Sequence, residues 1–520
     1  MIKWQRSRLC DVAAAVLLVS ASIFRLWYGA SHQLVSDEAY YWQWSRHLDY
    51  GYYDNTPLLA YFIHFIVGVF GINELGVRAG AVLCVLAMSV LVYLLARRMF
   101  SPEIGLLSLV ALNVTPLAAD ASFLMTQDPV QLLFWAATCY VIWRAVEADS
   151  DLQPLSESAR NGLWILGGVL AGLTIMAKLN GLIILPAIFA YLLLSPSARP
   201  WLKKPAPYVA GLIALLIFVP FLYWNHVHGN AYWLHGHEMA QRGRDKKLFP
   251  LRDIGDFLGA QAIVVSPLLY LTYLRLLPKL RLEASERESD AWLFLWCCSV
   301  SVTIVTAIVS LHNKVEGNWA VAAYVTGIIL IGASIALSWE RAATRVWHIA
   351  AFAFAILLST TGYIMPQLFG DLHLKPNQKL DRSLEMYGWR ETAARVDQER
   401  AVLGGPNKAF VFGVNYRIPS QMAFYLPDHP VTYSLALHER ASNYMFWEDP
   451  NKRIGQNAVF VNDSDGLDDL TECRAIFTKV TVQPPVEIRR WPYPDPIRTL
   501  QIYRCYGFKG YDRTRWQDGW

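Results

Sequence analysis

Residues Val35 to Pro57 read VSDEAYYWQWSRHLDYGYYDNTP and stand between two strongly apolar stretches of the chain. The segment contains the adjacent acids Asp37 and Glu38 and, near its end, Asp54, among many tyrosines and tryptophans. Tyrosine and tryptophan are enriched where a membrane meets water, so the segment is predicted to be a loop at a membrane surface. Loops on a rigid scaffold often carry functional residues, and the clustered acids are therefore candidates for chemistry.

The composition of the whole chain indicates a membrane protein. Of its 520 residues, 54% are hydrophobic and only 17% are charged, and the mean hydropathy is +0.26. Soluble domains usually contain about 25% charged residues, so low charge combined with long apolar runs is typical of a polytopic membrane protein. The net charge of +4 is small for this length and does not indicate nucleic-acid binding.

About eleven apolar runs approach the roughly 20 residues that cross a bilayer core of about 30 Å. The predicted spans lie near residues 11–30, 75–96, 104–119, 129–146, 163–177, 182–194, 207–224, 254–277, 291–311, 319–339 and 347–368. The first span lacks a small-residue cleavage site and contains Arg25, so it is predicted to be an uncleaved helix. Gly168 and Gly172 have the GxxxG spacing that is typical of closely packed membrane helices.

The basic residues predict how these spans are oriented. Lysine and arginine cluster at alternate ends of successive spans, as expected for loops that stay on the cytoplasmic side. The apolar run 57–70 decides on which side of the membrane the later loops lie. At about 1.5 Å per residue it is roughly 21 Å long, which is too short to cross easily. This run is therefore predicted to be an interfacial helix on the outer surface of the membrane.

The predicted fold is an all-α polytopic membrane protein with a C-terminal extracytoplasmic α/β domain. The membrane domain is expected over residues 1–369 and includes an active-site loop at 31–57 and the interfacial helix at 57–70. The soluble domain is expected over residues 370–520, outside the membrane on the same side as the loop.

Residues 370–520 are more polar than the rest of the chain. Short β-prone runs such as AFVFGV, NAVFVN, AIFTKVTV and TLQIYRCYGF alternate with a helical stretch near 391–402. Cys473 and Cys505 lie in this part, where an oxidising compartment would permit a disulfide. The sequence leaves open whether the two are bridged.

Acidic and basic residues on the predicted outer face are the candidates for function. The candidate catalytic acids are Asp37, Glu38, Asp54 and Asp128. A carboxylate can act as a base when burial and a neighbouring acid raise its pKa. Cations on an outer face run against the usual charge rule, and they complement phosphate oxygens. The candidate phosphate-binding cations are Lys178, Arg242, Arg244 and Lys314. The simpler alternatives are that these acids are merely solvated and that the tyrosines and tryptophans of the first segment form a belt at the membrane interface.

One motif resembles the first outer loop of GT-C glycosyltransferases that use polyprenyl-phosphate sugars: SDEAYYWQWSRHLDYGYYDNTPLLAYFIHFIVGVFGINELGVRAGAVL. This family includes protein O-mannosyltransferase-like enzymes and the transferases that add aminoarabinose or galacturonic acid to lipid A or lipopolysaccharide. The resemblance continues through TQDPVQLLFW, GLTIMAKLNGLIILP, FVPFLYWNHVHGNAYW, FLGAQAIVVSPLL and VEGNWAVAAY. It implies a GT-C fold for the membrane domain.

The resemblance also implies roles for particular residues. Asp37 matches the leading catalytic acid of the family, and Asp54 and Asp128 match two further acids of its active site. The residues expected to bind substrate are Lys178, Asn225, His237, Arg242, Arg244, Lys314, Glu316 and Asn318. Relatives often have His-Pro or Lys-Pro after the acid matched by Asp54, whereas this chain has Asn-Thr-Pro. No cofactor is firmly predicted, and Asp54 with His237 is a weak candidate pair of ligands for a divalent cation.

The predicted function is transfer of a sugar from a polyprenyl-phosphate donor to an envelope acceptor, with inversion implied by the resemblance. The predicted location is the periplasmic face of a bacterial inner membrane. The acceptor is lipid A, lipopolysaccharide core, another glycan or a protein, and the sequence leaves the sugar open. The alternative is a secondary transporter or a flippase for lipid-linked sugars. Such proteins bury ionisable groups near the membrane midplane and often contain repeated halves, whereas here the acids gather at one face.

Overall fold

The computed structural model describes residues 2–147, 155–242, 251–278, 286–312, 315–372, 381–435, 442–463 and 467–512. The chain forms two compact units. The first unit comprises Met1–Tyr28, Asn55–Leu59 and Arg78–Gly362, and the second comprises Gly29–Asp54, Ala60–Val77 and Tyr363–Trp520. The acidic segment therefore groups largely with the C-terminal part of the chain, whereas the predicted division at residue 370 assigned it to the membrane domain. That division remains a prediction.

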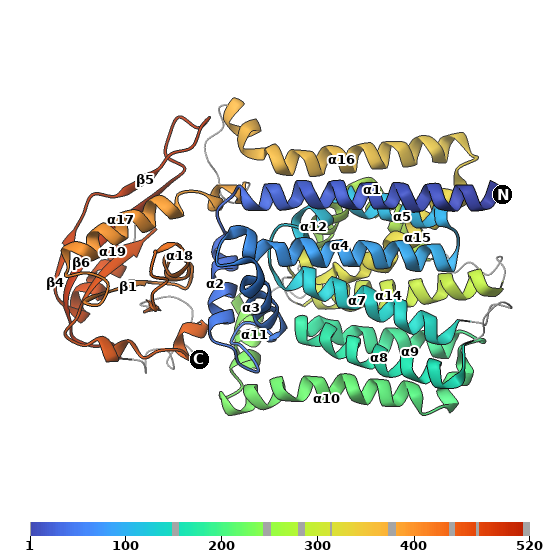
Figure 1. Ribbon diagram of the computed structural model, residues 1–520, viewed down its shortest axis with the longest axis horizontal. Helices are drawn as coiled ribbons and strands as arrows, with labels where there is room; N and C mark the ends of the chain where they lie inside the picture. The colour runs from blue at the N-terminus through green and yellow to red at the C-terminus, as the bar shows by residue number, and fades with distance from the viewer. Residues whose placement is uncertain are drawn as a thin grey trace. The chain divides into compact units, whose positions relative to one another are not determined.

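The first unit is built of α-helices (Figure 1). Within the described part of the chain, seven helices are long and apolar enough to cross a membrane. They are α1 (Ile2–Ala30), α4 (Glu74–Met99), α7 (Gln127–Val146), α8 (Glu157–Ala177), α10 (Ala206–Val227), α14 (Glu286–Ser310) and α16 (Ala342–Asp371). An eighth candidate is the pair α12 (Leu251–Val265) and α13 (Pro267–Leu276), which is bent by 107°. The prediction of a multi-pass helical membrane protein is confirmed.

Three predicted spans correspond to shorter helices, so the predicted total of eleven is not confirmed. These helices are α5 (Pro102–Asn113), α9 (Ile184–Leu194), which follows the 3-10 turn η1 (Leu179–Ile183), and α15 (Ala322–Ser338). The apolar run near 104–119 is interrupted because Thr115 caps a new helix, α6 (Pro116–Ala121). The Thr115 hydroxyl accepts a hydrogen bond from the backbone N–H of Ala118 at 3.2 Å.

Polar contacts join the helix ends at one end of the first unit. They link α1 to α4 (Asp11 with Arg97), α4 to α7 (Arg98 with Glu147, 2.6 Å), α8 to the residues before α10 (Glu157 with Lys204, 2.9 Å) and α9 to α14 (Ser195 with Asp290, 2.7 Å). The N-terminus lies at this end (Figure 1). The prediction that basic residues gather on one face therefore holds for these helices. Because α7 has 20 residues, its other end lies about 30 Å away.

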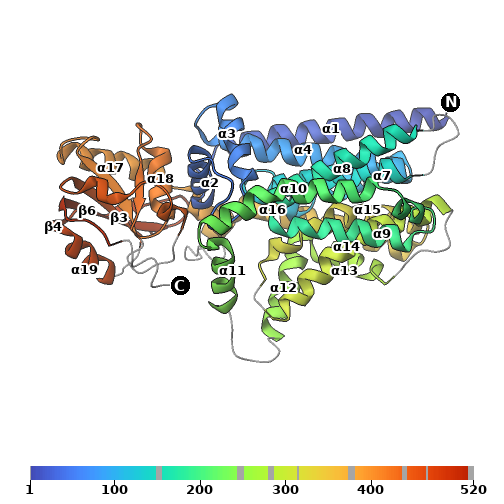
Figure 2. The same ribbon diagram turned by 90° about the horizontal axis from the view of Figure 1, so that it is seen from below.

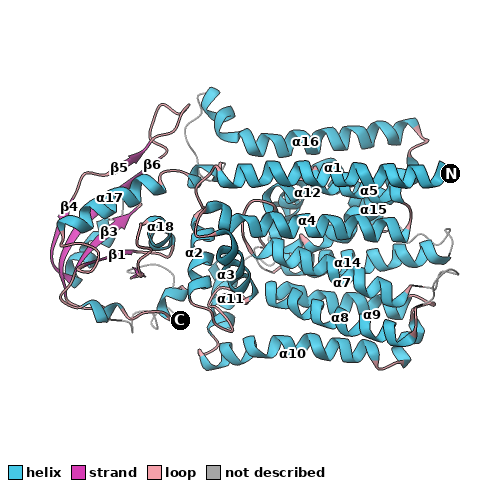
Figure 3. Cartoon of the chain, viewed as in Figure 1, coloured by secondary structure: helices cyan, strands magenta, loops and turns pink. Residues whose placement is uncertain are grey.

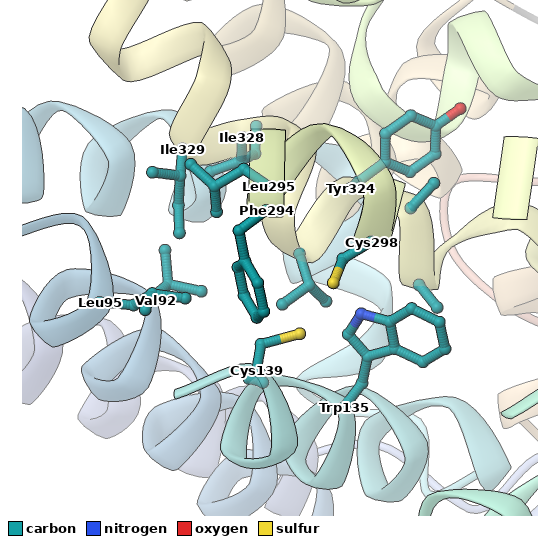
Figure 4. Packing of buried hydrophobic residues seen from close by; sticks show 14 of the residues in the cluster. Val92, Leu95, Trp135, Cys139, Phe294, Leu295, Cys298, Tyr324, Ile328 and Ile329 are labelled. Carbon is teal, nitrogen blue, oxygen red and sulfur yellow. The ribbon is translucent and has the colours of Figure 1, made fainter. Parts of the chain in front are cut away.

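The core of the first unit forms where α4, α7, α14 and α15 meet (Figure 4). Trp135 of α7 and Phe294 of α14 are fully buried in this cluster. Glycines bring neighbouring helices close together. A Cβ atom at Gly168 on α8 would lie 2.4 Å from the carbonyl oxygen of Ala210 on α10. The GxxxG spacing therefore serves helix packing, as predicted.

The second unit combines helices with a mixed sheet (Figure 3). Its strands are β1 (Ala409–Gly413), β2 (Thr432–Ser434), β3 (Asn457–Asn462), β4 (Phe477–Val482), β5 (Val486–Ile488) and β6 (Arg498–Phe508). The strand order is β2-β1-β3-β6-β4, with β5 paired to β6; β1 runs parallel to β2 and β3, and β6 antiparallel to β3 and β4. The β-prone runs of the sequence are thus strands, which confirms the α/β character.

Helices cover this sheet and precede it in the chain (Figure 2). The helices of the second unit are α2 (Ser36–Arg46), most of α3 (Leu58–Phe70), α17 (Trp389–Val402), α18 (Arg417–Tyr425) and α19 (Leu467–Ile476), with 3-10 turns η4 (Arg382–Met386), η5 (Asn443–Met445) and η6 (Pro450–Arg453). The run 57–70 is thus helical, and its interfacial position remains a prediction. Cys473 on α19 and Cys505 on β6 are both buried, with their sulfur atoms 3.7 Å apart. The two thiols are neighbours, and they are not bridged.

Candidate active site

The acidic segment after the first span forms a helix, α2, instead of an open loop. Val35 is extended and α2 begins at Ser36. Glu38 is buried and accepts a hydrogen bond from the backbone N–H of Val35 at 3.1 Å. An acid here satisfies an N–H group that a helix start leaves unpaired, and it favours the positive end of the helix dipole. Glu38 was a candidate for catalysis, and its contacts are those of a helix cap next to Asp37.

Asp37 is half-buried and is held by a tyrosine from far along the chain. Tyr416 lies directly before α18 and donates its hydroxyl hydrogen to Oδ1 of Asp37 at 2.9 Å. Burial and the negative charge of Asp37 raise the pKa of Tyr416 above its usual value, so the hydroxyl stays protonated. Tyr416 is a neutral donor that orients the carboxylate, and the guanidinium group of Arg417 also interacts electrostatically with Asp37.

Asp54 has the same arrangement with a second tyrosine. Tyr40 donates to Oδ2 of Asp54 at 2.7 Å and accepts a hydrogen bond from the backbone N–H of Asn443 at 2.8 Å. Burial and the charge of Asp54 raise the pKa of Tyr40. The ring centroids of Tyr40 and Tyr416 lie 4.3 Å apart. We call the four residues Asp37, Asp54, Tyr40 and Tyr416 the tyrosine–aspartate site.

Most other aromatic residues of the segment belong to the core of the second unit. Trp42, Trp44, Tyr52 and Tyr53 are each at most 1% exposed. Trp44 and Tyr52 stack with their ring centroids 4.5 Å apart. Side chains buried to this extent cannot form an interfacial belt, so that interpretation is wrong for these four. Tyr50, which is 58% exposed, is still available for this role.

A second polar cluster lies in the first unit, at the start of α7. Oδ1 of Asp128 accepts a hydrogen bond from Nζ of Lys178 at 2.6 Å, and Oδ2 accepts one from Nδ2 of Asn318 at 2.8 Å. Lys178 is the extended residue that ends α8, and Asn318 lies in the 3-10 turn η3 (Gly317–Ala320). Three residues that the sequence identified separately therefore form one network. We call it the lysine–aspartate site.

The lysine–aspartate site is braced by neighbouring amides. Nδ2 of Asn180 donates to the carbonyl oxygen of Trp319 at 2.8 Å, and Oδ1 of Asn180 accepts from Nε2 of Gln131 at 2.5 Å. These bonds connect η1, η3 and α7 around the lysine. The site is thus held by three segments that are distant in sequence.

Lys178 retains one donor for a ligand. Its ammonium group has three N–H donors, and two of them point to Oδ1 of Asp128 and, at 3.3 Å, to the carbonyl oxygen of Asn318. The described residues offer no partner for the third. Asp128, in contrast, uses both oxygens and is paired with a cation. Its contacts suit a residue that positions Lys178 better than they suit a base.

The remaining predicted residues have varied surroundings. Asn225 is buried and uses its amide within the turn between α10 and α11 (Ala231–Arg242), where Oδ1 accepts from the backbone N–H of Tyr232 at 2.9 Å. This gives Asn225 a structural role that the sequence did not predict. His237 is exposed on α11, and Glu316 is exposed and precedes η3. Arg242 ends α11, and Arg244 and Lys314 lie outside the described residues.

The weak metal prediction gains no support from the described residues. Among them, no group of three or more histidine, cysteine, aspartate or glutamate side chains is arranged to hold a metal ion. Asp54, one of the two candidate ligands, is hydrogen-bonded to Tyr40.

Sequence reasoning missed the partners that the C-terminal part of the chain supplies. Tyr416 and Asn443 lie 379 and 403 residues from the side chains that they contact, Asp37 and Tyr40. Neither belongs to a recognisable local motif. The only signal was the polar, aromatic character of the segment itself, which required buried partners from elsewhere.

A helical membrane part with acids at helix ends, joined to a small α/β part, is the architecture expected of the GT-C class. The crystal structure of ArnT from Cupriavidus metallidurans in the apo state matches this chain with a TM-score of 0.64 at 17% identity, over 95% of this chain and 98% of that chain. The structure of ArnT from that organism bound to undecaprenyl phosphate matches with a TM-score of 0.63 at 15% identity, over 94% and 97%. The chain has the fold of these proteins.

The sequence comparisons point to the same class. Residues 54–224 match the family model described as dolichyl-phosphate-mannose-protein mannosyltransferase. The lipid A galacturonosyltransferase RgtD of Rhizobium johnstonii is 29% identical over 308 residues, which are 59% of this chain and 61% of that protein. The undecaprenyl phosphate-alpha-4-amino-4-deoxy-L-arabinose arabinosyl transferase of Pseudomonas aeruginosa is 30% identical over 236 residues, 42% of this chain and 41% of that protein. The matched part of the chain thus spans about three fifths of the length of RgtD and about two fifths of the length of the arabinosyl transferase. The predicted resemblance to this class of glycosyltransferases is confirmed.

Proposed function

We propose that this protein is a membrane glycosyltransferase that moves a sugar from a polyprenyl-phosphate donor to a hydroxyl group of an envelope acceptor. The observation that carries the proposal is the tyrosine–aspartate site, in which two half-buried acids are each held by a neutral tyrosine hydroxyl. Such acids are oriented and keep their charge, as a general base requires. The fold, shared with ArnT over 95% of the chain, supports the same class of activity.

The proposed reaction is an inverting displacement at the anomeric carbon. Asp37 takes the proton of the acceptor hydroxyl as the acceptor oxygen forms its bond to that carbon. The bond from the carbon to the phosphate oxygen breaks, and the polyprenyl phosphate leaves with one more negative charge than the donor carried. Tyr416 positions Asp37, while Glu38 caps α2 and orients the same segment.

The developing charge on the phosphate requires a cation, and Lys178 is the proposed group. Its third N–H donor is the one that would bind phosphate, and Asp128 and Asn318 fix the direction of the ammonium group. Asp128 therefore acts as a positioning residue in this proposal. Asp54 and Tyr40 hold the segment that carries Asp37.

We propose lipid A or lipopolysaccharide as the acceptor class, because the named relatives transfer galacturonic acid to lipid A or use an undecaprenyl-phosphate aminoarabinose donor. The decisive experiment mixes the purified full-length protein in detergent with a polyprenyl-phosphate sugar and lipid A. Chromatography should reveal free polyprenyl phosphate and glycosylated acceptor in equal amounts. Movement of intact donor across proteoliposomes, with no bond cleavage, would instead favour a flippase.

We propose the bacterial inner membrane as the location, with the second unit on the periplasmic side. A Cys10→Ser background allows labelling to test this, because the other six cysteines are buried. In intact spheroplasts, a membrane-impermeant maleimide should label Val482→Cys in β4. It should label Lys203→Cys, near the start of α10, only after permeabilisation. Labelling of Lys203→Cys from outside would reverse the proposed orientation.

A further inference from the structure

A cavity of about 480 Å³ lies in the first unit, between α13, α14, α15 and α16. These helices are labelled in Figure 2. The cavity contacts the C-terminal end of α15 and the first residues of α16. Asn318 lies just before the opposite end of α15, and a helix of 17 residues is about 25 Å long. The cavity is therefore separate from the lysine–aspartate site and has no part in the proposed transfer.

Two arginines give the cavity a positive lining. Arg275 lies with its guanidinium carbon 4.5 Å from the ring centroid of Trp347, and Nε1 of Trp347 donates to the hydroxyl of Thr272 at 2.9 Å. Arg341 lies at the turn between α15 and α16 and also contacts the cavity. Within the part of the chain that the structure describes, neither arginine is paired with a carboxylate. The cation–π contact orients Arg275 and leaves its charge uncompensated.

Neutral polar groups complete the lining. The hydroxyl of Ser338 lies 3.1 Å from Nε2 of His348, and His348 is only 5% exposed. Its other ring nitrogen, Nδ1, has no partner among the described residues. The hydroxyl of Thr344 lies in the first turn of α16, where the helix start presents backbone N–H groups. A described lining with two cations and no acid is complementary to an anion, and guanidinium groups suit phosphate oxygens.

The flanks of the cavity indicate where that phosphate comes from. Leu337 and Val346, on α15 and α16, are 53% and 67% exposed, and Trp339 between them is 40% exposed. On a helix that spans a membrane, such exposed apolar residues contact lipid, and tryptophan marks the interface with the headgroups. A phosphate at this level is part of a membrane lipid.

We propose that this cavity binds the phosphate headgroup of an anionic phospholipid. The two guanidinium groups would contact the phosphodiester, and the apolar flank would contact the first part of the acyl chains. Basic pockets between membrane helices are known to bind anionic headgroups in this way. Zwitterionic lipids are disfavoured because they bring an ammonium group next to Arg275 and Arg341.

Native mass spectrometry of the full-length protein tests the proposal. The delipidated protein is titrated separately with phosphatidylglycerol, phosphatidylethanolamine and inorganic phosphate. The test variant is Arg275→Gln with Arg341→Gln, and the matched control is Arg345→Gln, an exposed arginine on α16 outside the cavity. Phosphatidylglycerol should bind the unmodified protein and the control alike. Each arginine near an anionic lipid contributes about fivefold in affinity, so the double variant should bind about 25-fold more weakly.

The three titrations separate the possible outcomes. Equal binding of phosphatidylglycerol by the double variant and the control would overturn the proposal. Binding of inorganic phosphate in competition with the lipid, at comparable concentration, would overturn the assignment to a lipid and make the site one for a soluble anion. If the double variant is not monodisperse on gel filtration, Arg341→Gln alone should still lower the affinity about fivefold, since this side chain is exposed.

Discussion

The two carboxylate sites of this protein hold their acids in opposite ways. In the first unit, Asp128 is bonded to an ammonium group and an amide, and both of its oxygens are engaged. In the second unit, Asp37 and Asp54 are bonded to the hydroxyls of Tyr416 and Tyr40. An ion pair compensates the charge of its acid, whereas a tyrosine hydroxyl orients the acid through a neutral hydrogen-bond donor. We therefore propose that the acids of the second unit transfer the proton and that Lys178 of the first unit recognises the charge of the donor.

The largest expected effect comes from Asp37→Asn. Asparagine keeps the shape and can still bond to Tyr416, but it cannot take a proton at neutral pH. Single-turnover transfer with saturating donor should fall at least about 100-fold, the lower end of the usual contribution of general acid–base catalysis. Donor binding, measured on the same preparation, should survive.

Two matched variants sharpen this test. Asp49→Asn changes another acid of the same segment and should leave transfer nearly normal. Asp128→Asn should impair donor use more than the chemical step. Near-normal turnover in Asp37→Asn, together with a large loss in Asp128→Asn, would reverse the roles that the comparison assigns.

Removal of the cation should have the next largest effect. Lys178→Gln removes the proposed phosphate contact, and a hydrogen bond to a charged group contributes about 1.5–3 kcal/mol, or roughly 10- to 100-fold in donor affinity. The measurement is donor saturation in steady state. Lys204→Gln, which breaks an exposed ion pair with Glu157, is the control.

A double variant separates binding from structure. Lys178→Gln leaves Asp128 buried without its cation, and adding Asp128→Asn should restore thermal stability without restoring donor affinity. Recovery of donor affinity in the double variant would mean that Lys178 serves only to neutralise Asp128.

A smaller loss is expected from Tyr416→Phe. The variant keeps the ring packed against Tyr40 and removes one hydrogen bond to Asp37. Transfer should fall about tenfold, since an oriented acid loses about 1.5 kcal/mol of charge-assisted bonding. The pH–rate profile should also shift, because Asp37 loses a donor that favours its charged form. Tyr506→Phe, on β6 of the same unit, should change neither quantity. An unchanged profile in Tyr416→Phe would make the contact merely structural.

The last prediction concerns stability at alkaline pH and does not involve activity. Burial raises the pKa values of Tyr40, Tyr52, Tyr416 and Tyr444 above the ordinary value of 10.0. Above pH 10 the unfolded chain therefore releases protons that the folded chain retains. The free energy of unfolding should be constant below that pH and should decrease as pH rises, by up to about 1.4 kcal/mol per pH unit for each tyrosine.

Thermal unfolding between pH 8 and 11, with tyrosinate absorbance, measures this dependence. Tyr416→Phe should give a shallower decrease than the unmodified protein. An equal slope in both proteins would show that Tyr416 ionises as easily in the folded state as in the unfolded state.

Hydropathy predicted the long helices well, because a chain in lipid must satisfy its backbone groups within the helix. It was wrong for the run near 104–119, since the cap at Thr115 begins a new helix within apolar surroundings. Such a break depends on one hydroxyl, to which an average over about 19 residues is insensitive. The sequence does contain a signal for the cap made by Glu38, because an acid in the first turn of a helix is common. The segment was nevertheless predicted to be a loop.

The candidate site was predicted as a set of residues and not as an arrangement. Asp128 and Lys178 were both identified, but their pairing joins positions 50 residues apart. Asp37 was identified from its motif, whereas Tyr416 was not, because nothing near it in sequence marks it as a partner. Local patterns identify chemistry, and tertiary packing decides which groups meet.

The contact between Asp37 and Tyr416 has a consequence for synthesis. Its two residues are 379 positions apart, so a ribosome working at about 5–20 residues per second produces the second roughly 20 to 75 s after the first. During that interval the segment around α2 has emerged without the tyrosine and the amide that later hold it. Its buried aromatic side chains then lack their final neighbours, and a chain that is released early never acquires them. Premature termination anywhere before residue 416 should therefore leave the acids without their tyrosine partner, even when every membrane helix has been inserted.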